Sequence, residues 1–299
     1  MEPWEMEFWK DSRARVLEGE PLSRHTSFRI GGPATLVVPD SAEELSEILD
    51  GMRRAGGGGG FRLLGKGTNL LVSEKGLAEP VVKLSEKGFG GVRAEGTRIV
   101  AGAAAPLAKL LWAAAEEGLS GLEALAGIPG SVGGAVRMNA GGKELQIGRR
   151  VVEVEAVDPG GGSKRIGGRE LSFGYRASSL SGSIVTEVRL ELERSSSPDV
   201  RGRMREYLEA KRRSQPLGEP SAGCVFKNPA EIPAGRLIDE LGMKGIRVGG
   251  ARVSEKHANY IVSDGTASFA DVVELIGTIR DRASVERGIR LELEIEIWE

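Results

Sequence analysis

Hydrophobic positions recur with two different periods along the chain, and their alternation predicts a mixed protein of helices and strands. A spacing of three and four residues follows Ser41 and Glu44, which together form a capping-box signature. The apolar residues on this helical face are Leu45, Ile48, Leu49 and Met52. A period of two over residues 151–157 and 184–192 is typical of strands with one buried face.

The same two periods divide most of the remaining chain into short elements. Further helices are predicted from Pro106 onward, over 199–213, and over 234–241 and 268–287, where Gly242 and Gly288 end them. Short apolar runs predict strands, which are 36–38, 61–64, 70–72, 80–84, 99–101 and 259–262. Residues 1–20 are interpreted as a charged helical lead-in, with docking points at Trp4, Trp9 and Val16. Loops are expected at the glycines of 56–60 and over 245–250.

Strict alternation returns at the C-terminus, over residues 289–298. Ile and Leu occupy the odd positions, and Arg290 and three glutamates occupy the opposite face. The pattern predicts a strand with a solvated face. By itself it does not distinguish one glutamate from another.

Composition narrows the class of protein. The 299 residues include 41 basic and 43 acidic ones, for a net charge of −2, which argues against a nucleic-acid-binding protein with a basic face. No apolar run reaches the roughly 20 residues that span a bilayer, and residues 1–5 do not resemble a signal peptide. A single cysteine excludes an internal disulfide and indicates the reducing cytoplasm, and two histidines offer no metal-ligand cluster.

Two glycine-rich stretches are candidates for ligand binding. Residues 65–69 form a turn between strands whose backbone N–H groups suit a phosphate, although a plain hairpin turn explains it equally well. It is not a Walker A loop, because Gly67 stands where Ser or Thr must bind Mg²⁺. Residues 127–142 follow a helix and lack the G-x-G-x-x-G spacing of a Rossmann site. Their small side chains indicate either backbone wrapped closely around a ligand or a tight self-packed turn.

Two further residues carry reactive or charged groups in unusual settings. Arg176 follows Tyr175 and precedes small hydroxyl residues, which suits a carboxylate or diphosphate, although a surface ion pair is the commoner role of an arginine. Cys224, the only cysteine, follows a glycine and lies between Pro220 and Pro229. Its thiol suits a nucleophile or a proton donor, and a small buried hydrophobe is the alternative.

The motifs taken together resemble one family. Gly223 to Pro229 is similar to the G-[S/C]-x-F-K-N-P segment of the UDP-N-acetylenolpyruvoylglucosamine reductases, in which serine usually fills the cysteine position. Residues 26–34, 65–72, 127–141 and 256–260 also match motifs of that family, so the resemblance extends from about His25 to Trp298. The chain departs from the family pattern in the residues directly after Gly141. It also departs at position 293, where leucine stands in place of the usual proline. The segment before Asp199 lacks the insertion of the longer form, so the chain resembles the shorter, type II enzyme.

The resemblance implies noncovalent FAD, with NADPH as the hydride donor. The implied FAD-binding residues lie in the two glycine-rich stretches and are Gly65, Lys66, Gly67, Thr68, Asn69, Leu70, Gly127, Ile128, Pro129, Gly130, Ser131, Gly133, Gly134, Ala135 and Asn139. The implied catalytic residues are Arg176, which stabilises charge on the substrate carboxylate, Cys224, which protonates C2, and Glu294. The implied substrate-binding residues are Tyr175, Arg213 and Asn228, and no metal is implied.

The resemblance also implies a fold class and a division into domains. The fold is expected to be α+β, with FAD-binding subdomains of the vanillyl-alcohol-oxidase kind over 1–85 and 86–200. A substrate-binding domain is expected over 201–299, with its last strand returning to the flavin region. The expected product is UDP-N-acetylmuramate for peptidoglycan, made by a cytoplasmic monomer that acts on a UDP-sugar and binds neither nucleic acid nor membrane. Another flavin oxidoreductase of this fold and a non-catalytic nucleotide-sugar module remain alternatives.

Overall fold

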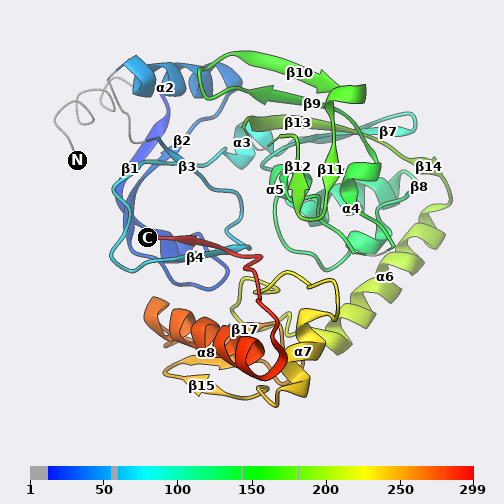
Figure 1. Ribbon diagram of the computed structural model, residues 1–299. Coiled ribbons are helices and arrows are strands. Elements are labelled where there is room, and N and C mark those ends of the chain that lie inside the picture. The colour runs from blue at the N-terminus through cyan, green and yellow to red at the C-terminus, as the bar shows by residue number, and fades with distance from the viewer. Residues whose placement is uncertain (1–12, 55–59, 143, 181) are drawn as a thin grey trace. The chain divides into compact units, whose positions relative to one another are not determined.

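The computed structural model describes residues 13–54, 60–142, 144–180 and 182–299 (Figure 1). The docking points at Trp4 and Trp9 and most of the glycine run lie outside these ranges. The chain divides into two compact units. Unit 1 comprises residues 1–18, 35–65 and 78–210, and unit 2 comprises residues 19–34, 66–77 and 211–299. Segments far apart in sequence therefore build unit 2 together.

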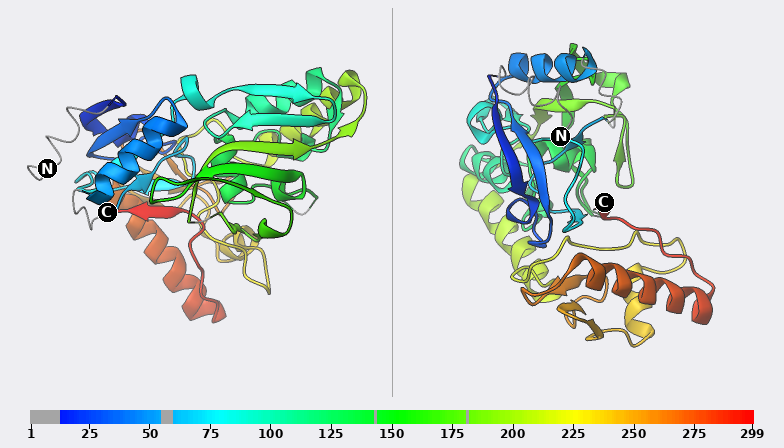
Figure 2. Two further views of the ribbon diagram at one scale, coloured as in Figure 1. Left: turned by 90° about the horizontal axis from the view of Figure 1, so that it is seen from above. Right: turned by 90° about the vertical axis from the view of Figure 1, so that its left-hand side faces the viewer.

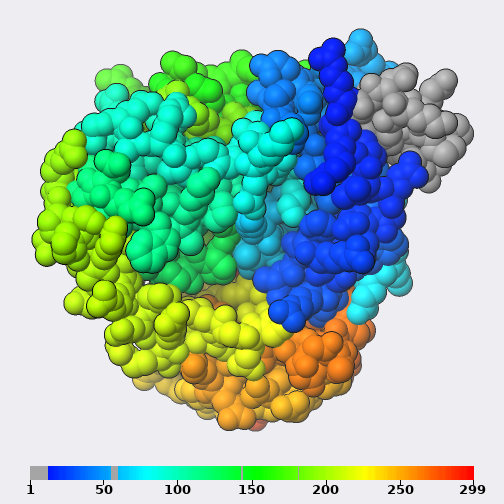
Figure 3. All heavy atoms as spheres, turned by 180° about the vertical axis from the view of Figure 1, so that it is seen from behind, coloured from blue at the N-terminus to red at the C-terminus, as the bar shows by residue number. Residues whose placement is uncertain are grey.

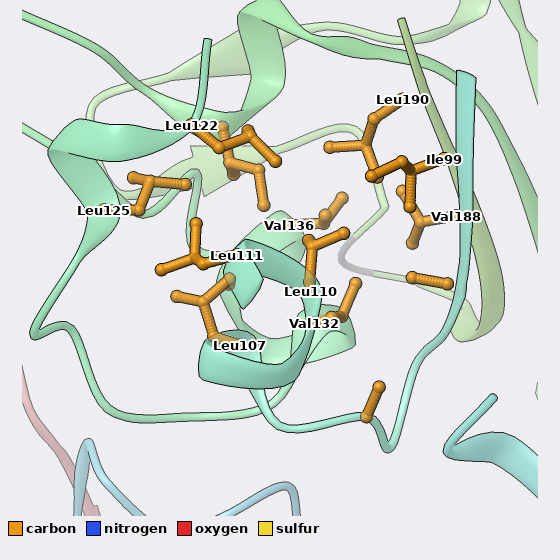
Figure 4. Packing of buried hydrophobic residues seen from close by; sticks show 14 of the residues in the cluster. Ile99, Leu107, Leu110, Leu111, Leu122, Leu125, Val132, Val136, Val188 and Leu190 are labelled. Atoms are coloured by element: carbon orange, nitrogen blue, oxygen red, sulfur yellow. The ribbon is translucent and has the colours of Figure 1, made fainter. Parts of the chain in front are cut away.

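A five-stranded antiparallel sheet forms the larger part of unit 1 (Figure 1). In spatial order its strands are β10 (Ser163–Gly167), β9 (Val151–Val157), β13 (Ile184–Glu191), β7 (Arg98–Gly102) and β6 (Val92–Glu95). The helices α4 (Leu107–Glu116) and α5 (Val132–Arg137) contribute to the same apolar core as the sheet. In Figure 4, Leu110 of α4 lies beside Val132 and Val136 of α5, and the sheet residues Ile99 and Val188 belong to the same cluster. Burial of these side chains fixes α4, which precedes the second glycine-rich stretch, and α5, which lies within it.

A second sheet of unit 1 contains parallel strands. Its order is β1 (Arg15–Pro21), β2 (Pro33–Val38), β5 (Val81–Val82) and β3 (Arg62–Leu63). The helix α2 (Ala42–Arg54) buries the predicted face against β2 and β5 (Figure 2). Smaller elements are α3 (Glu86–Phe89), the pair β8 (Leu119–Ser120) and β14 (Glu193–Arg194), and the pair β11 (Phe173–Gly174) and β12 (Ala177–Ser178).

Unit 2 has its own apolar core under a three-stranded antiparallel sheet. The strands are β15 (Arg247–Val248), β16 (Ala251–Val253) and β17 (Ile261–Ser263), and the helices are α7 (Ala234–Glu240) and α8 (Phe269–Arg287). A separate parallel pair joins β4 (Leu70–Val72) to the last strand, β18 (Glu296–Trp298). Figure 3 shows the yellow and orange atoms of residues 211–290 as one continuous mass. The helix α6 (Ser197–Ser214) carries the chain from unit 1 into unit 2.

Three local predictions were wrong. Residues 15–21 form a strand rather than part of a helix, because Gly19 and Pro21 disfavour a helix. The loop predicted over 245–250 contains β15, since Gly249 and Gly250 form a two-residue hairpin turn between β15 and β16. The C-terminal strand is limited to residues 296–298.

Most of the strongly periodic elements were predicted correctly. The strand over 151–157 and the helix over 268–287 match β9 and α8 closely, and α8 has a capping box at Ser268 and a left-handed Gly288 at its end. Among the described residues, the structure contains no helix that is both long and apolar enough to cross a membrane. The predicted boundaries at residues 85 and 200 differ from the two compact units, because β4 pairs with the C-terminal strand.

Candidate active site

The segment around Cys224 turns its thiol-bearing residue away from the core of unit 2. Ala222, Val225 and Phe226 are buried in that core, whereas Cys224 is only partly buried. Gly223 precedes it with a φ of +81°, in the left-handed region that favours glycine. Cys224 is therefore not a core hydrophobe, and its position suits a group that meets a ligand.

Main-chain hydrogen bonds hold this segment from two sides. On one side, the N–H of Val225 donates to the carbonyl of Asn259 over 2.8 Å. On the other, the carbonyl of Val225 accepts from the N–H of Glu294 at 2.8 Å, and the N–H of Lys227 donates to Glu292 at 2.9 Å. The residue after Cys224 is thus bonded directly to Glu294. Two of the three predicted catalytic residues lie on adjacent segments of unit 2.

Asn259 reinforces this arrangement with its side chain. Its Oδ1 accepts from the N–H of Phe226 at 3.0 Å, and its Nδ2 donates to the carbonyl of Phe226 at 2.8 Å. The side chain is buried, with the residue only 3% exposed. It satisfies two buried main-chain groups that would otherwise cost stability. The sequence placed this residue in the family motif over 256–260 and in a predicted strand, and the signal for its local role is a polar residue inside the apolar run of 258–262.

Glu294 differs from the other glutamates of the C-terminal segment. It is partly buried, whereas Glu292 and Glu296 are exposed. The Asn69 side chain donates from Nδ2 to the main-chain carbonyl of Glu294 at 3.1 Å, and the N–H of Glu296 donates to the carbonyl of Asn69 at 2.9 Å. The first glycine-rich turn therefore contacts the segment that carries the predicted catalytic glutamate.

Ser27 ties the same turn to the Cys224 segment. Its N–H and Oγ both donate to the carbonyl of Gly67, at 3.0 and 3.2 Å, and Oγ lies 2.6 Å from the carbonyl of Ser221. Gly67 has a φ of +62°, and a Cβ added there would lie 2.0 Å from the carbonyl oxygen of His25. Glycine is required at this position by the protein's own backbone. Leu70, the last FAD-binding residue predicted in this turn, is a buried residue of β4.

The second glycine-rich stretch belongs to unit 1. Gly127 and Gly130 have positive φ angles, and Ser131 caps the short helix α5. The N–H groups of Gly133, Gly134 and Ala135 already donate within the protein, to Ala103, the Ser131 side chain and the Ser131 carbonyl. These three residues do not offer free backbone donors. The N–H of Ile128 also donates within the protein, to the carbonyl of Leu125 at 3.0 Å, so four of the predicted FAD-binding residues already use their main-chain donors.

The two glycine-rich stretches meet within unit 1 at Gly65. A Cβ added there would lie 2.9 Å from Ser131 Oγ, so the start of the first turn approaches the second stretch closely. Gly65 is exposed despite this close approach. The exposed main chain at Gly65 suits contact with an anionic ligand.

Arg176 lies in unit 1, in the turn that joins β11 to β12. It is partly buried, and its Nη1 lies 3.5 Å from the carbonyl of Gly141. Its φ is +53°, a conformation that costs a residue with a side chain about 1–3 kcal/mol. Its guanidinium carbon lies 5.9 Å from the ring centroid of Tyr175, which is 51% exposed. Strained residues of this kind cluster at functional sites.

The remaining predicted substrate-binding residues have plainer surroundings. Arg213 is exposed near the end of α6. Asn228 is exposed, and its Oδ1 accepts from the N–H of Ala234 at the start of α7, at 3.0 Å. Lys211, on the same helix as Arg213, is partly buried, and burial lowers its pKa to about 8.

Comparison with known proteins gives a consistent result over nearly the whole chain. Residues 215–298 match the family model described as the C-terminal domain of UDP-N-acetylenolpyruvoylglucosamine reductase, and residues 33–167 match the model of an FAD binding domain. A protein of Moorella thermoacetica with that reductase name is 48% identical over 289 residues, which cover 96% of this chain and 94% of the relative. A protein of Caldanaerobacter subterraneus with the same name is 42% identical, and the match covers 93% of this chain and 92% of the relative.

Solved structures agree with this assignment. The crystal structure of UDP-N-acetylenolpyruvylglucosamine reductase from Thermus caldophilus matches with a TM-score of 0.84 at 40% identity, covering 96% of this chain and 100% of that one. The structure of Physcomitrella patens BBE-like 1 matches at a TM-score of 0.50 and 17% identity, covering 64% of this chain and 44% of that one, and shares the fold alone. The expected α+β fold with a vanillyl-alcohol-oxidase-like flavin region is confirmed. By sequence and by structure, this chain belongs to the UDP-N-acetylenolpyruvoylglucosamine reductase family.

Proposed function

We propose that this chain reduces UDP-N-acetylglucosamine enolpyruvate to UDP-N-acetylmuramate, with NADPH as the reductant, in the synthesis of peptidoglycan precursors. Relatives that carry the name of this reductase match this chain over nearly their full lengths. The observation that supports the proposal best is the hydrogen bond between Val225 and Glu294, because it holds a thiol and a carboxyl group on adjacent segments. A non-catalytic sugar-binding module has no need of that pair.

We infer that FAD is held at the two glycine-rich stretches. Gly65 comes so close to Ser131 that a side chain would crowd it, and the left-handed Gly67, Gly127 and Gly130 allow the main chain to turn sharply. The main chain around Gly65, Gly67, Gly127 and Gly130 would hold the diphosphate of FAD. Bound there, FAD would supply hydride chemistry, linking oxidation of NADPH to reduction at C3 of the enolpyruvyl group.

Cys224 is assigned as the proton donor. Reduction of the enolpyruvyl double bond adds a hydride at C3 and requires a proton at C2, and the S–H bond of Cys224 breaks as the new C–H bond forms. The partly buried position of Cys224 and the glycine before it leave the thiol accessible. A general acid of this kind contributes about 10²–10⁴ in rate.

Arg176 and Glu294 are assigned to the substrate carboxylate. Negative charge develops there as C3 receives the hydride, and the planar guanidinium of Arg176 binds two carboxylate oxygens at once. Glu294, when protonated, donates a hydrogen bond to the same group or orients the thiol. Tyr175, Arg213 and Asn228 are assigned to the rest of the UDP-sugar.

We place the enzyme in the cytoplasm as a monomer. A chain with one cysteine suits a reducing compartment, which also supplies NADPH. One chain carries all the assigned residues, so the site needs no group from a second copy.

The test is a direct assay of the purified, FAD-loaded protein. With NADPH and UDP-N-acetylglucosamine enolpyruvate it should yield a product with two hydrogen atoms more, identified by mass spectrometry. NADPH oxidation should depend on the enolpyruvyl sugar when oxygen is excluded. A protein that binds FAD yet forms no such product would disprove the proposed reaction.

A further inference from the structure

The turn that carries Arg176 lies in a hairpin that is too short to be stable on its own. Its two strands are two residues long, with Phe173 paired to Ser178 and Gly174 paired to Ala177. Isolated two-stranded hairpins are marginally stable even at greater length. Arg176 also adopts a φ of +53°, which the surrounding structure must impose. Contacts from elsewhere in unit 1 therefore have to hold this turn.

Asn139 supplies one such contact from the end of the second glycine-rich stretch. Its Nδ2 donates to the carbonyl of Gly174 at 2.8 Å, directly before the turn. The same Nδ2 donates to Gln146 Oε1 at 3.1 Å, and Oδ1 accepts from the N–H of Gly148, also at 3.1 Å. Asn139 is 2% exposed. Both of its amide hydrogens and its carbonyl oxygen are thus used within the protein.

Neighbouring contacts hold the rest of the hairpin. The Phe173 ring packs on Gly148, where an added Cβ would lie 2.3 Å from a ring carbon. On the second strand, Ser178 Oγ donates to the carbonyl of Arg137 at 2.9 Å. Both strands are therefore tied to the residues that end α5, one through Asn139 and the other through Arg137.

We propose that Asn139 is a positioning residue for Arg176. By holding the Gly174 carbonyl, it fixes the turn so that the guanidinium of Arg176 is presented to the substrate carboxylate. The sequence predicted Asn139 as an FAD contact, and the proposal replaces that role with one that acts through the hairpin. It rests on the role proposed for Arg176 above.

The test compares Asn139→Asp with wild type. Aspartate keeps the shape and the acceptor for the Gly148 N–H but cannot donate to Gly174. We expect hydrogen exchange of the amides of residues 173–178 to rise about tenfold. Return of the flavin absorbance on adding the enolpyruvyl sugar should slow by about 10²-fold, the effect of a misplaced group. The FAD dissociation constant and bleaching by NADPH should not change.

Two further variants keep the test decisive. Thr186→Val is the matched control, because Thr186 is 8% exposed and donates to the carbonyl of Glu155, away from the hairpin. It should leave the exchange of 173–178 unchanged. If Asn139→Asp does not fold, Asn139→Gly allows the φ of +45° without strain and carries the same expectation. Weaker FAD binding with normal exchange of 173–178 would show that Asn139 is a cofactor contact and overturn the proposal.

A double-mutant cycle with Arg176→Lys separates the two proposals. If Asn139 acts through Arg176, the double variant should be scarcely slower than Arg176→Lys alone. Effects that multiply would overturn the positioning role and leave the role of Arg176 standing. If Arg176→Lys reoxidises its flavin with the enolpyruvyl sugar at the wild-type rate, the role proposed for Arg176 and the positioning role of Asn139 are both overturned.

Discussion

The single cysteine is the residue on which the chemistry can be tested most directly. As proton donor it is needed only after the flavin has been reduced. We expect Cys224→Ala to bleach normally with NADPH and to lose about 10²–10⁴ in the rate of reoxidation by the enolpyruvyl sugar. Cys224→Ser should retain much of that rate, because a hydroxyl also donates a proton. Stopped-flow absorbance measures both phases.

Chemical modification gives an independent control at the same residue. Cys224 is partly buried rather than enclosed in the core, so iodoacetamide should alkylate it and inactivate the enzyme. Bound enolpyruvyl sugar should protect the thiol. Wild-type reoxidation in Cys224→Ala would exclude the thiol as the acid.

His257 gives the stability of unit 2 a defined pH dependence. Burial, and then the nearby charge of Lys244, lowers the pKa of His257 below its ordinary value of 6.5. Its Nδ1 accepts from the N–H of Asn259 at 3.2 Å, which requires that nitrogen to be unprotonated. The unfolded chain takes up this proton first as the pH falls, so the contribution is complete above pH 6.5 and is lost below it.

The matched variant is His257→Gln, which offers a side-chain acceptor and does not titrate. Urea unfolding between pH 8 and about 5 should show wild type losing stability more steeply below pH 6.5 than the variant. Parallel curves would exclude His257 as a source of acid sensitivity.

At the scale of elements, hydrophobic periodicity predicted the helices and strands that bury one face against a core. The face of α2 and the strand β9 follow from apolar positions alone, because each buries one side against a core. The C-terminal segment shows the limit. Its odd-numbered residues from 289 to 297 are all buried or partly buried, as alternation predicts. Yet among its described residues only Glu292 and Glu294 form main-chain hydrogen bonds to the Cys224 segment, and the strand itself covers residues 296–298.

The Asn259 side chain forms two hydrogen bonds with the main chain of Phe226, here called the clamp, and one substitution removes both. Asn259→Ala leaves the N–H and the carbonyl of Phe226 buried without these partners, at about 1–3 kcal/mol for each group. We expect a lower urea midpoint together with slower reoxidation by the enolpyruvyl sugar, because Cys224 is two residues away. Bleaching by NADPH should be nearly normal.

A control is needed to show that a loss of stability does not by itself slow reoxidation of the flavin. Ser254→Ala is the control, since Ser254 is 1% exposed and accepts one local hydrogen bond from Lys256. It should lower stability without slowing reoxidation. An Asn259→Ala variant that is destabilised but reoxidises at the wild-type rate would make the clamp purely structural.

At the scale of the molecule, the motifs were recognisable from sequence but their contacts were not. Asn69 bonds to Glu294 across 225 positions, and Ser27 bonds to Ser221 across 194. No local pattern encodes such pairs, because they depend on how the chain returns to unit 2. Gly67 illustrates the consequence: a side chain there would strike the His25 carbonyl, so flavin loss in Gly67→Val would report backbone strain rather than a lost FAD contact.

The mode of FAD binding is a property of the whole fold. Noncovalent FAD stabilises only the folded state, so the free energy of unfolding should rise by about 1.4 kcal/mol for each tenfold excess of free FAD above its dissociation constant. Apo-protein titrated with FAD should therefore show a melting temperature that climbs steadily with the logarithm of FAD concentration. Acid or heat should release all the flavin into the supernatant. Colour that stays with the precipitate, and a melting temperature independent of added FAD, would instead indicate a covalent link.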